Sequence, residues 1–372
     1  MYSSVLNKTS SFLFYLEQRR GVYFTSLVVA VILLGFAAIY VTPALAPMQL
    51  GRGYASLSIN PFDFSEQNNL RFRILTPLLA YLVGLRGSLY LIFPMIIALF
   101  FLSAIYYFLR QKHNSFESVL ITMLVCFSSP ILFLLHFQGY VDVTSYLLIY
   151  LIIIFIKNNA IRTLLLVLLL FNHESNLFII PGLLFLYYIN STNRIKAIAY
   201  GGMSILLAII PFYYYRKFIT GISPVEYNFD MYYSQISQNI NSITSHIGIG
   251  CFYSFKLFWL IPLIAIYYYW KEKNWQQLIL FFLIIFGSLG QLIIASDTSR
   301  LMGLAFPAIL FGAVKLKEQW GKEVFLRRTF YLILFNFLIP QFYVGQSVMI
   351  PFYPLPVSII LKYFYGIETW VG

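Results

Sequence analysis

Charged residues are scarce in this chain. They make up 10% of its 372 residues, whereas an ordinary soluble domain carries about 25%. Hydrophobic residues make up 60% and aromatic residues 19%. A soluble fold of this length could not hide so much apolar surface, because much of any domain's surface stays in contact with water. The shortage of charge therefore excludes an ordinary soluble protein and predicts a chain embedded in a lipid bilayer.

Cysteine and the common catalytic motifs are also nearly absent. The two cysteines, Cys126 and Cys251, lie in or beside apolar segments and form no CxxC pattern, so they indicate neither a disulfide framework nor a metal site. The chain has no phosphate-binding glycine-rich loop, no GxSxG motif and no Cys/His cluster. Because nothing indicates nucleotide hydrolysis, an enzyme of this kind would need a substrate that is already activated.

The net charge of +12 is typical of some nucleic-acid-binding proteins. Here the basic residues form short clusters between apolar runs instead of covering one polar face. We therefore expect no nucleic-acid partner, and we interpret the basic clusters as topology signals of a membrane protein.

Apolar runs of about 20 residues recur along the whole sequence, as in membrane-spanning helices. A cleaved signal peptide is an alternative for the first run, since Ala44-Leu45-Ala46 resembles a cleavage site, but the run is long and Pro47 would follow the cut. We expect it to be a retained span. The predicted spans are 23–42, 88–109, 116–136, 142–156, 198–214, 251–270, 275–295, 301–316 and 329–349.

Lysine and arginine favour the cytoplasmic side of a membrane. With a cytoplasmic N-terminus, most basic clusters fall on that side, and the two long loops, 43–87 and 215–250, face outward. The sequence thus predicts one transmembrane domain over residues 1–372, an all-α bundle of about 9–11 membrane helices, and its short connecting loops favour a bacterial inner membrane. We expect residues 74–86 to form an interfacial helix, because they are too few to span.

Residues 163–190 lie between two basic clusters but are too few for two spans of about 20 residues each. They predict two half-helices, 163–171 and 177–189, whose polar tip at 172–176 lies in the outer half of the membrane. One long tilted helix that places Arg194 outside is the alternative.

The first outer loop combines acids with arginines. Asp63 and Glu66 precede Arg71 and Arg73. A partly desolvated carboxylate can accept a proton from a hydroxyl, and arginine suits phosphate through paired donors. Surface ion pairs of little energetic value are the alternative.

Three further polar segments interrupt apolar sequence. Gln138 and Asp142 lead into a span, although Asp142 could simply cap that helix. His173 and Glu174 form the tip of the hairpin, where a satisfied buried pair is the alternative. Asp297 and Arg300, three residues apart, could form a structural clamp or aim an arginine at a lipid-linked phosphate.

All four polar segments fall on the same predicted side of the membrane. Ionisable groups at membrane depth are costly, and they usually face a cavity, pair with one another or act on a substrate. The sequence therefore predicts one cavity open to the outer leaflet and lined by carboxylates and arginines.

This layout resembles the bacterial polytopic glycosyltransferases of the GT-C structural class. The matching features are acids shortly after the first span, the run from Arg71 to Pro77 and two motifs ahead of proline-containing helices, which are His173-Glu174 before Pro181 and Asp297-Thr298-Ser299-Arg300 before Pro307. The chain departs from the family in two ways. Its first loop has no adjacent acidic pair, and it has no large soluble C-terminal domain.

The resemblance implies transfer of a sugar from a polyprenyl-phosphate donor to a glycan, lipid or protein acceptor on the outer side, with inversion in a single displacement. It assigns catalysis to Asp63, Glu66 and Glu174. It assigns substrate binding to the remaining candidates, which are Arg71, Arg73, Gln138, Asp142, His173, Asp297 and Arg300. A divalent metal ion stays open as a cofactor, without a ligand set.

Two other functions stay open at this point. A polysaccharide polymerase or ligase would act on the same carriers, but its long basic outer loop is poorly matched by 215–250. A transporter or flippase would use broken helices, yet the sequence shows no matching interrupted segments in two halves.

Overall fold

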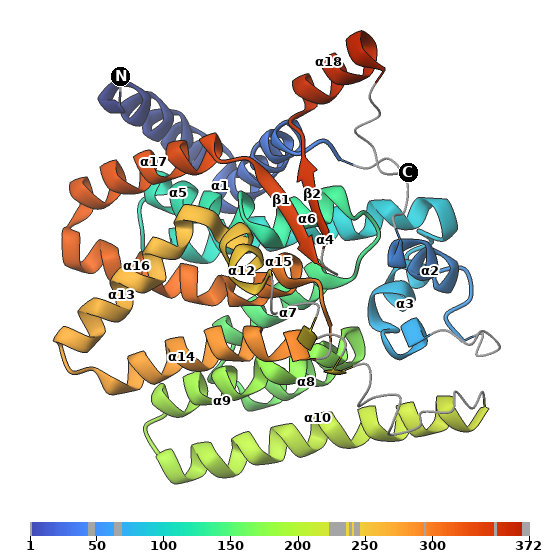
Figure 1. Cartoon of the computed structure of the whole chain (residues 1–372). Helices are drawn as coiled ribbons and strands as arrows, with labels where there is room; N and C mark the ends of the chain where they lie inside the picture. The colour runs from blue at the N-terminus through green and yellow to red at the C-terminus, as the bar shows by residue number, and fades with distance from the viewer. Residues whose placement is uncertain are drawn as a thin grey trace.

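The computed structural model describes residues 2–43, 49–62, 69–222, 236–237, 240–241, 246–293, 295–345 and 348–366. These residues form a helical bundle with one short β-hairpin, seen near the centre of Figure 1. The N-terminal part comprises α1 (Tyr2–Tyr40), α2 (Leu50–Leu57), η1 (Asn69–Phe72), α3 (Leu75–Leu82), η2 (Gly87–Leu91), α4 (Ile92–Arg110), α5 (Ser115–Cys126), α6 (Ser129–His136) and α7 (Asp142–Ile154).

The rest of the described chain is also mostly helical. It comprises α8 (Asn159–Asn172), η3 (Glu174–Phe178), α9 (Ile180–Ile189), α10 (Arg194–Ile222), α12 (Ile247–Phe255), η4 (Lys256–Trp259), α13 (Leu260–Lys271), α14 (Trp275–Gly290), η5 (Gln291–Ile293), α15 (Thr298–Leu301), η6 (Met302–Ala305), α16 (Phe306–Trp320), α17 (Lys322–Leu338), β1 (Gln341–Gly345), β2 (Val348–Phe352) and α18 (Leu355–Tyr365).

Within the described ranges, six helical segments are long and apolar enough to cross a membrane, and a seventh arises if α5 and α6, bent by 52°, form one span. The six are Lys8–Tyr40, Gly87–Arg110, Arg194–Ile219, Ile247–Lys271, Trp275–Ile293 and Thr298–Trp320. The outer helices turn large apolar side chains outward, and Ile195 and Ile198 of α10 are 81% and 66% exposed. Such surfaces need lipid and not water around them. The protein is a multi-pass integral membrane protein.

One span differs from the others because it runs through the middle of the bundle. In Thr298–Trp320, 89% of the most apolar stretch is buried inside the protein, whereas the corresponding share in Arg194–Ile219 is 28%. A helix this enclosed is packed by protein on all sides, so a polar residue on it can be satisfied by neighbouring helices. Arg300 lies at its start.

The bundle has two distinct ends. We call the end that holds the connections 111–114, 155–158, 190–193 and 272–274 the basic end, which lies at the left in Figure 1; α2 and α3 lie at the opposite end, on the right. Ion pairs join helices at the basic end, with Arg110 Nε 2.9 Å from a Glu17 oxygen and Lys317 Nζ 2.7 Å from Glu117 Oε2. These pairs satisfy the charges where the helices meet.

The sequence prediction of two short helices around a polar tip is confirmed. Asn159–Asn172 and Ile180–Ile189 flank the 3-10 turn Glu174–Phe178. A short helix within 74–86 is confirmed as well, since α3 covers Leu75–Leu82. Its first turn contains Pro77, a position where the missing N–H costs little.

The predicted span 329–349 is wrong. The helix α17 ends at Leu338, Ile339 is extended (φ −87°, ψ 120°) and Pro340 follows it. Proline disfavours helix in the residue before it and cannot continue a helix itself. The chain instead forms the antiparallel hairpin β1–β2, in which Tyr343 pairs with Ile350.

One further prediction needs correction. The loop 215–250 is shorter than expected, since α10 continues to Ile222 and α12 begins at Ile247. Of the 9–11 predicted membrane helices, the described residues show six or seven of full length, and the segments Asp142–Ile154, Asn159–Asn172 and Glu174–Ile189 are shorter apolar helices.

Candidate functional site

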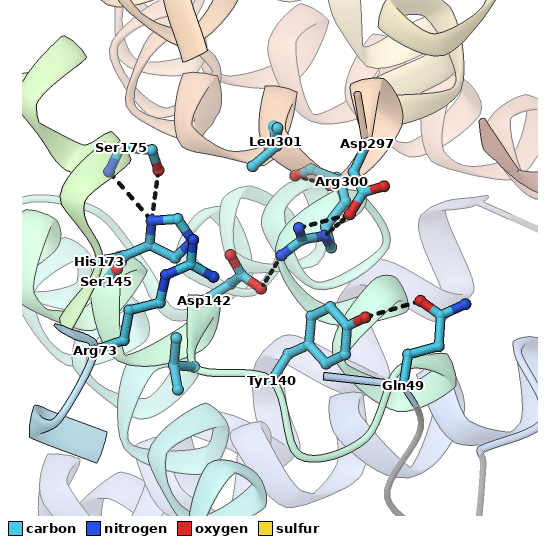
Figure 2. Close-up of polar contacts among 12 residues, drawn as sticks. Gln49, Arg73, Tyr140, Asp142, Ser145, His173, Ser175, Asp297, Arg300 and Leu301 are labelled. Atoms are coloured by element: carbon cyan, nitrogen blue, oxygen red, sulfur yellow. Dashed lines mark hydrogen bonds and ion pairs between the residues drawn. The ribbon is translucent and has the colours of Figure 1, made fainter. Parts of the chain in front are cut away.

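An arginine held between two aspartates is the centre of the candidate site. Arg300 Nη1 lies 2.6 Å from Asp142 Oδ2, and its Nη2 and Nε donate to Asp297 Oδ2 at 2.7 and 3.2 Å. Figure 2 shows the guanidinium between the two carboxylates. The Arg300 side chain is only 6% exposed, so both contacts are charge-assisted hydrogen bonds in a largely water-free setting.

Local folding explains why Arg300 reaches both acids. Asp297 directly precedes α15, and a residue three positions along a helical turn lies on the same face. Asp142 is the first residue of α7, and its carboxylate accepts a hydrogen bond from Arg300. Ser129 Oγ of α6 donates to the carbonyl oxygens of Ser299 and Arg300 at 2.9 and 3.1 Å, which anchors α15.

A second arginine–carboxylate pair lies beside the first. Arg73 binds Glu174 with two parallel hydrogen bonds, Nε–Oε2 at 3.0 Å and Nη2–Oε1 at 2.7 Å. Its third contact is Nη1 to the hydroxyl of Tyr54 at 3.0 Å. Burial works against the charge of Arg73, but Tyr54 and Glu174 outweigh it and hold the pKa of the guanidinium above its ordinary value.

The tip between α8 and α9 is fixed by buried amide side chains. Asn172 Nδ2 donates to the Val141 carbonyl at 2.9 Å and to Ser145 Oγ at 2.8 Å, and Asn176 Nδ2 donates to the same Ser145 oxygen at 2.8 Å. His173 Nδ1 lies 2.8 Å from Ser175 Oγ. These bonds tie the tip to the start of α7, which carries Asp142.

Two tyrosines that sequence reasoning missed complete the surroundings of Arg300. Figure 2 shows the ring of Tyr140, and its centroid lies 4.8 Å from the guanidinium carbon of Arg300. The hydroxyl of Tyr343, on β1, donates to Asp297. The chain has 30 tyrosines, so residue type gave no signal for Tyr343, whereas Tyr140 could have been found from its place two residues before Asp142.

We call Arg73, Asp142, Glu174, Asp297 and Arg300 the ion-pair cluster. In Figure 2 the carboxylate of Asp142 lies between the guanidinium groups of Arg73 and Arg300. Three carboxylates and two guanidiniums leave one formal negative charge. A cavity of about 10 Å³ adjoins Asp142 and Arg300, and a volume of that size holds about one water molecule.

The remaining predicted residues are Asp63, Glu66, Arg71 and Gln138. Asp63 and Glu66 lie outside the described residues. Arg71 is buried, and its carbonyl oxygen accepts a hydrogen bond of 2.9 Å from the Tyr215 hydroxyl. Gln138 is buried in the connection between α6 and α7, where its carbonyl oxygen meets Gly51 so closely that a side chain at Gly51 would overlap it.

Within the described part of the chain, no three His, Cys, Asp or Glu side chains are grouped so that they could hold a metal ion. Both acids nearest the centre of the site already bind Arg300.

Comparison of the chain with protein-family models, with curated proteins and with solved structures finds no match.

Proposed function

We propose that the ion-pair cluster is the catalytic centre of a membrane glycosyltransferase of the GT-C type, which moves a sugar from a polyprenyl-phosphate donor to an outer-surface acceptor. The observation that carries this proposal is Arg300, buried at the start of the central span and held by Asp142 and Asp297. Costly charges at membrane depth favour a functional role.

In this proposal the arginines receive the phosphate. Arginine offers paired donors that match phosphate oxygens. Arg300 and Arg73 both have carboxylate partners within the protein. An incoming phosphate would take over some of these donors, and the released carboxylate would then be free to act on the acceptor.

The three acids of the cluster differ in their readiness to accept a proton. Glu174 is bound by Arg73 through both oxygens. Asp297 receives hydrogen bonds from Arg300 and Tyr343. Asp142 binds Arg300 through Oδ2. Among the three acids of the ion-pair cluster, Asp142 is therefore the best candidate for the base. The family resemblance implies Asp63 and Glu66 as two further candidates.

The proposed reaction is one displacement. The base takes the proton of the acceptor hydroxyl while that oxygen bonds to the anomeric carbon. The bond from the anomeric carbon to the phosphate oxygen breaks, and polyprenyl phosphate leaves with both electrons. Arg300 and Arg73 stabilise the negative charge that gathers on the leaving phosphate.

The test uses purified protein in lipid with polyprenyl-phosphate sugars and candidate acceptors. Release of polyprenyl phosphate with sugar transfer is the expected result. Asp63→Asn, Glu66→Gln and Asp142→Asn separate the candidate bases, and Lys315→Gln is the control because Lys315 pairs with Glu272 at the basic end. No transfer with any donor would overturn the proposal.

A transporter is the second candidate, favoured by the 52° bend between α5 and α6 and by the short helices that follow. Counterflow of a solute across vesicles, without release of lipid phosphate, would establish it. Release from a diphosphate carrier alone would instead identify a polysaccharide polymerase or ligase.

A further inference from the structure

A large cavity opens at the basic end, far from the ion-pair cluster. Its volume is about 770 Å³, and its walls come from α4, α7, α9, α13, α14 and α16. Pockets that bind small molecules commonly measure about 300–1,000 Å³. The cavity is therefore large enough for a ligand and plays no part in the proposed glycosyl transfer.

The cavity is apolar inside and polar at its rim. Phe108, Ile153 and Phe311 are among its wall residues, while Lys112 and Lys157 belong to the connections at its mouth. A ligand that fits both parts has an apolar tail and an anionic head. A lipid of the membrane leaflet at this end has that chemistry.

The two rim lysines differ from the other basic residues nearby. Arg110, Lys315 and Lys317 each form an ion pair with a glutamate. Within the described residues, Lys112 and Lys157 form no ion pair, and none of the described residues lining the cavity is acidic. The mouth therefore carries positive charge that the protein itself does not neutralise.

We propose that this cavity binds one anionic phospholipid, with its phosphate at Lys112 and Lys157 and an acyl chain between α7, α14 and α16. Basic pockets between membrane helices are suited to anionic head groups. Polar side chains of the rim, Asn158 and Asn190, supply further donors. A lipid held between these helices would fasten the short helices α7 and α9 to the central span α16.

The test is native mass spectrometry of the purified full-length protein with phosphatidylglycerol and, separately, phosphatidylcholine. One tightly retained phosphatidylglycerol is expected, with weaker retention of phosphatidylcholine. Lys112→Gln with Lys157→Gln should weaken phosphatidylglycerol binding by roughly tenfold or more. The matched control is Lys196→Gln with Lys322→Gln, which removes the same charge from the same end, outside the cavity lining.

A second variant tests the tail site. Ile153→Trp places bulk into the cavity while the lysines stay, and it should lower lipid retention without change in the thermal unfolding temperature measured in detergent. Equal retention of the two lipids, or equal loss in the cavity variant and its control, would overturn the proposal. Lipid retention that rises with lipid concentration without saturating would also overturn the proposal, since lipids bound non-specifically around the whole bundle behave in that way.

Discussion

Arg300 and Asp142 lie 158 residues apart in the chain, yet their side chains meet at 2.6 Å between Nη1 and Oδ2. This pair joins the start of the central span to the start of α7. Because Arg300 also binds Asp297, its removal would leave two carboxylates close together without their counter-charge.

The first prediction concerns this pair. Arg300→Gln should lower the free energy of unfolding by about 3–5 kcal/mol, since it leaves unpaired buried charge. Adding Asp142→Asn to that variant should restore part of the loss, with a coupling energy of about 0.5–3 kcal/mol. Unfolding in mixed micelles measures both values. Strictly additive losses would show that the two residues do not interact.

The chain's layout could be predicted because hydropathy depends on local sequence. The basic clusters and run lengths located the hairpin around residues 172–176 and the short helix α3. The spacing of Asp297 and Arg300 predicted their pairing, which the structure confirms.

Partners distant in sequence could not be predicted in this way. Nothing local assigns Asp142 to Arg300 or Arg73 to Glu174, since each pair joins segments that are distant in the sequence and meet only when the helices pack. The β-hairpin was missed for another reason. Apolar residues continue from α17 into the hairpin, so the length of the apolar run gave no boundary there, and the local signal that ends α17 is Pro340.

The second prediction concerns the paired donors of Arg73. Arg73→Lys keeps the charge but loses the two parallel bonds to Glu174. Under the proposed function it should slow sugar transfer by roughly ten- to a hundredfold, the effect of about 1.5–3 kcal/mol. Initial rates of lipid-phosphate release measure it.

The control for Arg73→Lys is Arg194→Lys, which makes the same change at the basic end, where Arg194 begins α10. If both variants transfer sugar at the wild-type rate, Arg73 has no part in the reaction, and the site must be sought elsewhere.

The third prediction concerns a close approach of two segments. Gly287 of α14 lies against the carbonyl oxygen of Phe178, at the end of the tip, and an added Cβ would overlap that oxygen. Gly287→Ala should therefore cost about 1–3 kcal/mol of stability and shift the tip that carries Glu174. Gly202→Ala is the matched control, because no other atom lies within 4 Å of a Cβ there. Equal stability of the two variants would contradict the packing.

The last prediction concerns His113, in the connection between α4 and α5. Burial and the charge of Lys317, whose Nζ lies 2.7 Å from Nδ1, lower the pKa of His113, against a partly opposing effect of Glu117 at 3.7 Å. Lys112 adds to the lowering, and Arg110 donates to the His113 carbonyl. The folded protein therefore favours the neutral ring.

The sign of the pH effect follows from that preference. In the unfolded chain His113 takes up a proton near pH 6.5, whereas the folded protein resists the proton until a lower pH. Its contribution to stability is complete above about pH 6.5 and is lost as the pH falls through the folded pKa. Between pH 7 and pH 5, the thermal unfolding temperature should thus fall less in His113→Gln than in the wild type. Lys317→Met should reduce the decline in part, because it removes the charge that opposes protonation. A decline in His113→Gln as steep as in the wild type would mean that this histidine titrates alike in both states.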